Sequence, residues 1–298
     1  MKLFTTWFYI GSLWFFVFGL VGCGDKSTSE ETDETTAISD SAAQVAKENV
    51  AAAIKQIPPP SEIPALLQAS GAEFEASLVN DLQKAEGYIT NNTEAALNLG
   101  IYATDLGYVV IHDKTQQAID YIQASRLLTD KLGITATFDD QLVAEFQENL
   151  DQKDTLVSIV DKALQNVDLY LRDNQRAPAA ALILAGTFVE GMYISAGSIR
   201  KYPAEIPEDV KNATVLKLID IIIRQKTTLR DVINSLEAIQ RDEKAEAVLT
   251  GLKEMETIYE QLNLEEKIAE NQGDLMVTET DLAALFDKVE EVRKTIVG

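Results

Sequence analysis

Apolar residues in this chain recur every three or four positions, and this period limits the fold to packed helices more firmly than any other feature. Near the C-terminus the apolar set is Leu282, Leu285, Phe286, Val289, Val292 and Ile296. The residues between them, Arg293 and Lys294 included, are mostly charged, so the pattern predicts a helix with one apolar and one polar face. Thr278, followed three residues later by Asp281, predicts a capping box at its start.

A second stripe of the same period runs from Leu156 to Leu171, with Asp154 as the expected N-cap. The segment 215–223 is apolar nearly all round, so we place it centrally in the core. No stretch shows the sustained two-residue alternation of a strand. The sequence therefore predicts an all-α, multi-helix bundle of roughly nine to eleven helices, possibly built from two similar halves.

A faint internal similarity raises the question of two halves. Residues 99–108 align with 184–193 at a constant offset of 85 residues, and both segments are apolar and rich in small residues. Each segment carries an acid three residues before a tyrosine, Asp105 with Tyr108 and Glu190 with Tyr193. Duplication and chance similarity between apolar helices both explain the match, because two copies do not make a repeat array.

Asp105, Tyr108, Glu190 and Tyr193 are the candidate ligand-binding residues. A carboxylate inside an apolar helix is costly to bury without partners. If the two helices meet, the acids can hold a hard cation between their oxygens, or one of them can have a raised pKa. The alternative is structural: each carboxylate accepts hydrogen bonds from nearby groups, and the small residues allow close helix packing.

Few other residues can carry chemistry. Cys23 is the only cysteine and His112 the only histidine. Zinc sites therefore lack their ligands, and a single cysteine and a single histidine nearly exclude Cys–His and Ser–His catalytic pairs. We expect no metal, no cofactor and no catalytic residue. His112 follows an apolar helix in a polar stretch and is expected to cap or end it.

The N-terminal 22 residues have the pattern of a secretory signal peptide, with Lys2 before an apolar stretch. The stretch ends in Leu20-Val21-Gly22-Cys23, which resembles the lipobox of bacterial lipoproteins. That resemblance implies cleavage before Cys23 and its lipidation, with two or three acyl chains as a stable membrane anchor. The alternative is an uncleaved transmembrane helix. Gly24, in place of an aspartate, favours the outer membrane under the best-known sorting rule.

Residues 23–38 form a polar, acidic segment expected to be a disordered tether, and 39–298 the helical domain. Removing Lys2 with the signal peptide leaves 25 basic against 48 acidic residues, a balance of −23. Such a charge repels nucleic acid, so none is expected as a partner.

Two further segments resemble a group of uncharacterised Bacteroidetes outer-membrane lipoproteins. One is the proline-rich run Ile57-Pro58-Pro59-Pro60, and the other is Asn98-Leu99-Gly100-Ile101-Tyr102-Ala103-Thr104-Asp105-Leu106. The resemblance implies an envelope location on the periplasmic or surface face, and no substrate.

We therefore expect a non-enzymatic lipoprotein that is anchored through Cys23 and binds another envelope protein or belongs to an assembly. The alternative is a small-ligand or cation-binding lipoprotein whose pocket lies between the helices carrying Asp105 and Glu190. An enzyme that uses only carboxylates is a third possibility, but no pair of acids across an open cleft can be located from the sequence.

Overall fold

The computed structural model describes residues 62–69, 71–134, 140–173, 176–201, 208–263 and 278–298, all within one compact unit, Ser39–Gly298. The predicted signal peptide, Cys23, the predicted tether and the proline-rich run lie outside the described residues. The predictions made for them stay predictions.

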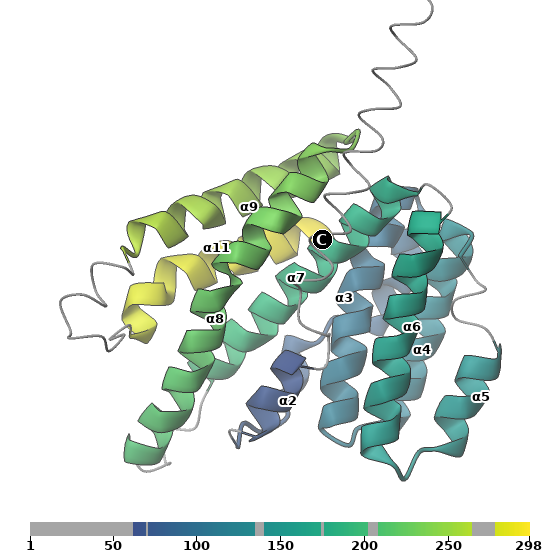
Figure 1. Ribbon diagram of the computed structural model, residues 1–298. Helices are drawn as coiled ribbons and strands as arrows, with labels where there is room; N and C mark the ends of the chain where they lie inside the picture. Colours follow the sequence, from purple (N-terminus) through teal and green to yellow (C-terminus); the bar gives the residue numbers. More distant parts are fainter. Residues whose placement is uncertain (1–61, 70, 135–139, 174–175, 202–207, 264–277) are drawn as a thin grey trace, which may run out of the picture. The chain divides into compact units, whose positions relative to one another are not determined.

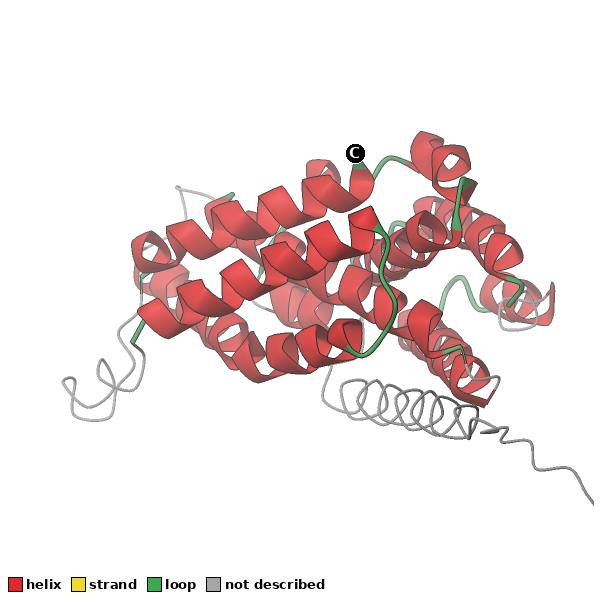
Figure 2. Cartoon of the chain, turned by 90° about the horizontal axis from the view of Figure 1, so that it is seen from above, coloured by secondary structure: helices red, strands yellow, loops and turns green. Residues whose placement is uncertain are grey.

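The prediction of an all-α, multi-helix bundle is confirmed. The described residues form helices and no strand, as Figure 2 shows. The α-helices are α2 (Glu62–Ala69), α3 (Asn92–Ile111), α4 (Thr115–Leu132), α5 (Asp140–Glu148), α6 (Lys153–Asp173), α7 (Ala177–Arg200), α8 (Glu208–Glu237), α9 (Glu243–Gln261) and α11 (Glu279–Val297), with 3-10 helices η1 (Ala76–Leu78) and η2 (Leu82–Ile89).

Helices α3 and α7 lie at the centre of the bundle. They pack against each other most extensively, while α4 and α6 cover α3, and α8 and α11 cover α7 (Figure 1). Every residue of α3 from Ala95 to Ile111 is buried, because this helix is mostly apolar and other helices pack around it. Helix α7 is also apolar enough and long enough to cross a membrane, but 83% of its apolar stretch is buried inside the fold.

Among the described α-helices, α3, α9 and α11 begin with a side-chain cap. Asn91 accepts a hydrogen bond from the Glu94 N–H at the start of α3, and Asp242 accepts one from the Ala245 N–H at the start of α9. At α11 the predicted capping box is present, with Thr278 and Asp281 each accepting from the other's backbone N–H. The predicted apolar stripe of α11 is buried throughout.

Two predictions about α6 and α8 were wrong. Asp154 is not an N-cap, because α6 begins at Lys153 and Asp154 lies in its first turn, where a negative charge is favourable beside the helix N-terminus. The segment 215–223 is not central either. Leu218, Ile219 and Ile222 are buried, whereas Leu216 is 49% exposed.

Candidate functional site

Two glycines bring α3 and α7 together at their crossing. A Cβ on Gly100 would overlap the backbone of Ile183 and lie 2.6 Å from the Thr187 nitrogen. A Cβ on Gly186 would overlap the Leu97 carbonyl oxygen in the same way. The backbones can approach this closely only because neither residue has a side chain. The crossing places Asp105 and Glu190, each just beyond its glycine, in the same buried region.

Asp105 and Glu190 are both fully buried. Asp105 Oδ2 accepts a hydrogen bond of 3.0 Å from the Asn80 backbone N–H, and the Glu190 carboxyl is its acidic neighbour. No donor in the described part of the chain reaches Asp105 Oδ1. Burial, and then the neighbouring Glu190 charge, raise the pKa of Asp105 well above its ordinary value.

Arg293 of α11 neutralises Glu190. Its Nε lies 2.6 Å from Glu190 Oε2 and its Nη2 lies 2.8 Å from Oε1, which is a bidentate ion pair. The guanidinium also stacks on the Tyr193 ring at 4.0 Å from the centroid. Burial alone would lower the pKa of Arg293, but the Glu190 carboxylate outweighs it and holds that pKa above its ordinary value. We call Asp105, Glu190 and Arg293 the buried triad.

Arg293 therefore does not belong to the exposed polar face of α11, where the sequence pattern put it. Its side chain is only 12% exposed. The helical period predicted the position of Arg293 on the helix. It could not predict the ion pair with Glu190, 103 residues earlier in the chain, which holds the Arg293 side chain in the interior.

Tyr193 lies with the buried triad, and Tyr108 does not. The Tyr108 hydroxyl accepts a 3.0 Å hydrogen bond from the Glu75 N–H, and its ring meets His112 edge-on at 4.7 Å. Three of the four candidate residues thus lie together, with Arg293 and Asn80 as neighbours that the sequence did not single out. The sequence could not identify Asn80 as part of the site, because its contact with Asp105 is made by the backbone N–H and not by the side chain.

Buried tyrosines fix the segment that carries Asn80. Tyr121 of α4 donates a 2.6 Å hydrogen bond to the Asn80 carbonyl oxygen, and Tyr102 of α3 donates one of 2.9 Å to the Asp81 carbonyl oxygen. The Asn80 side chain donates to the Tyr88 hydroxyl. These contacts hold the Asn80 N–H in position against Asp105.

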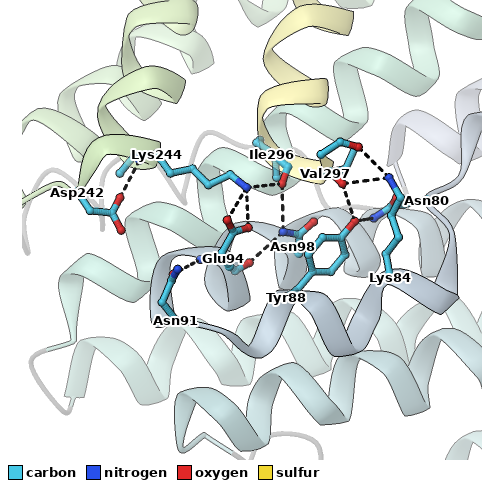
Figure 3. Close-up of polar contacts among 12 residues, drawn as sticks. Asn80, Lys84, Tyr88, Asn91, Glu94, Asn98, Asp242, Lys244, Ile296 and Val297 are labelled. Carbon is cyan, nitrogen blue, oxygen red and sulfur yellow. Dashed lines mark hydrogen bonds and ion pairs between the residues drawn. The ribbon is translucent and has the colours of Figure 1, made fainter.

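A second polar network fixes the end of α11 (Figure 3). Lys244 of α9 contacts both oxygens of Glu94 at 2.6 Å and donates to the Ile296 carbonyl oxygen at 3.0 Å. The Val297 carbonyl oxygen accepts hydrogen bonds from Tyr88 and Lys84. The last carbonyls of a helix have no partner within the helix. Their partners here join α11 to α3, α9 and η2, close to the turn that carries Arg293.

His112 ends α3, as expected, and its backbone N–H bonds back to Tyr108 and Val110. Its ring packs between Phe74 and Tyr108. Burial, and then the charges of Lys153 and Lys114, lower the pKa of His112.

One hollow of about 170 Å³ lies beside Tyr193, and neither Asp105 nor Glu190 lines it. Its other lining residues are Leu78, Ala196, Gly197, Arg200, Lys201, Phe286 and Glu290. The described residues contain no group of three or more His, Cys, Asp or Glu that could hold a metal ion.

The fold and this site define an all-α helical bundle with a charged triad in its core. The chain matches no protein-family model, no curated protein and no solved structure.

Proposed function

We propose that this protein is a lipid-anchored envelope lipoprotein without enzymatic activity, which binds another envelope protein or belongs to an assembly. The lipobox-like segment ending at Cys23 supports the anchor. The charge balance of −22 argues against binding to nucleic acid or anionic headgroups. The outer membrane, on its periplasmic or surface face, is the proposed location.

The observation that carries the non-enzymatic part is the ion pair between Glu190 and Arg293. The acids singled out as candidate ligands are held by groups of the same chain, Arg293 for Glu190 and the Asn80 N–H for Asp105. Partners of this kind are what a structural role requires. The triad thus supports a role in the fold rather than in ligand binding.

The cation-binding alternative has less support. It places a cation between the helices carrying Asp105 and Glu190, where Arg293 already provides one. It also needs Tyr108 at the same site, and that residue instead contacts Glu75 and His112.

The anchor is tested by mass spectrometry of the N-terminal peptide of full-length protein purified from membranes. We expect a peptide that begins at Cys23 and carries the mass of the acyl chains. Cys23→Ser should stay unprocessed and unlipidated, whereas Gly24→Ala, which keeps the cysteine, should be lipidated like the natural chain. A mature chain that retains residues 1–22 would contradict the proposal.

The interaction is tested by cross-linking in intact cells, followed by purification of the tagged full chain. We expect one envelope protein to co-purify in stoichiometric amount with the natural chain and to be lost from Cys23→Ser. Recovery of the chain alone from both preparations would contradict an assembly role.

A further inference from the structure

The charges of the buried triad do not balance if every group is ionised. Two carboxyls meet one guanidinium, and the two acids are fully buried. Glu190 already takes both guanidinium contacts, so an ionised Asp105 would have a single N–H donor, that of Asn80, and an acid as its other neighbour. Two adjacent carboxylates in a buried site strongly disfavour double ionisation.

A proton between the two acids removes this imbalance. Asp105 Oδ1, which no donor reaches, then becomes the donor itself, and the neighbouring Glu190 carboxylate is the acceptor. The site becomes one carboxylate, one guanidinium and one neutral acid, with no net charge. Each oxygen then has a partner of the right kind.

We propose that one proton bridges Asp105 and Glu190, and that its loss at alkaline pH loosens α11 from the α3–α7 crossing. This proton-dependent contact does not rely on the proposed function. Loss of the proton affects α11 because Arg293 of that helix pairs with Glu190 of α7. Asp105, the second acid, lies on α3.

The four tyrosines around the triad stay uncharged in the relevant range, whereas the neighbouring acids Asp81, Glu94 and Glu290 act on them as charges. Tyr102 lies on α3, Tyr121 on α4, Tyr193 on α7 and Tyr88 on η2. Burial is the first cause that raises the pKa of each of these four tyrosines above its ordinary value of 10.0. The nearby carboxylates add to the rise. Below about pH 9, the proton on the acids is therefore the one that changes the charge of this cluster.

The direction of the pH effect follows from the raised pKa of Asp105. In the unfolded chain this acid loses its proton near its ordinary value of 3.8, whereas the folded chain keeps it. The stabilising contribution is complete below that value. It is lost as the pH rises toward the folded pKa, and the unfolding equilibrium constant grows up to about tenfold per pH unit.

The test compares the natural full-length chain with Asp105→Asn, whose amide donates to Glu190 without a removable proton. Hydrogen exchange of α11 amides is measured at matched pH values from 6 to 9, so that intrinsic exchange rates cancel. As the pH rises, we expect the protection of α11 amides from hydrogen exchange to fall in the natural chain relative to Asp105→Asn. The fall should be up to about tenfold per pH unit. Asp81→Asn, which changes an exposed acid beside Asn80, should follow the natural chain. A constant ratio between the natural chain and Asp105→Asn would overturn the proposal.

Infrared spectroscopy of the natural chain provides a readout that does not depend on any variant folding. We expect the C=O stretching band of a protonated carboxylic acid at pH 7, which disappears as the pH rises. Its absence at pH 7 would equally overturn the proposal.

Discussion

Gly186 of α7 lies so close to α3 that a Cβ added to it would be 3.3 Å from the Gly100 Cα. This approach sets the distance between the two central helices. It therefore also sets the positions of Asp105 and Glu190, which follow these glycines along the two helices.

Gly100→Ala should lower the free energy of unfolding by about 3 kcal/mol or more, because the new methyl group meets backbone that cannot move aside. Urea denaturation measures the change. Gly87→Ala is the matched control, since nothing lies within 4 Å of a Cβ there, and it should change stability by less than about 1 kcal/mol. Equal effects at the two glycines would contradict the close crossing.

Lys244→Met should loosen the end of α11 by about 1–2 kcal/mol, because it removes the contacts to Glu94 and to the Ile296 carbonyl oxygen. Hydrogen exchange should show faster exchange in the last turn of α11. Lys253→Met provides the comparison, since Lys253 pairs with Glu237 on an exposed surface, and α11 should be unaffected. Unchanged exchange in Lys244→Met would show that the network does not hold the helix end.

His112→Phe should remove part of the loss of stability on acidification. The folded chain resists protonation of His112, whose pKa lies below its ordinary value of 6.5, whereas the unfolded chain accepts the proton. The stabilising contribution is present above that value and lost as the pH falls through the lowered pKa. Partial exposure of the ring keeps the effect small between pH 7 and pH 5. Denaturation curves at the two pH values measure it, and equal losses in both proteins would exclude His112 as the source.

The helical pattern predicted what depends on local spacing. The stripe of α11, its capping box at Thr278 and the end of α3 at His112 all follow from residues within a few positions of one another. Long-range contacts decide the rest. Leu216 is exposed although its segment is apolar, because α8 is covered on only part of its circumference.

The site was only partly predictable for the same reason. Asp105, Glu190 and Tyr193 could be found as unusual residues in apolar helices, and they lie together. Tyr108 shares their spacing but faces a different neighbour, Phe74, at a ring distance of 5.3 Å. Arg293 looked like any charged residue of an amphipathic helix, and only the packing of α11 on α7 pairs it with Glu190.

The central claim is that the acids of the candidate site serve the fold through Arg293. Arg293→Met tests it most directly, because it leaves Glu190 buried without its cation and should cost about 3–5 kcal/mol. Adding Glu190→Gln should restore part of this loss, since no unpaired charge then remains. Arg224→Met, which removes an exposed ion pair with Asp220, should change stability by less than about 1 kcal/mol. Urea denaturation of the four proteins decides the matter. We predict that Arg293→Met greatly lowers the free energy of unfolding and that adding Glu190→Gln restores part of this loss. A free energy of unfolding in Arg293→Met equal to that of the natural chain would contradict the account.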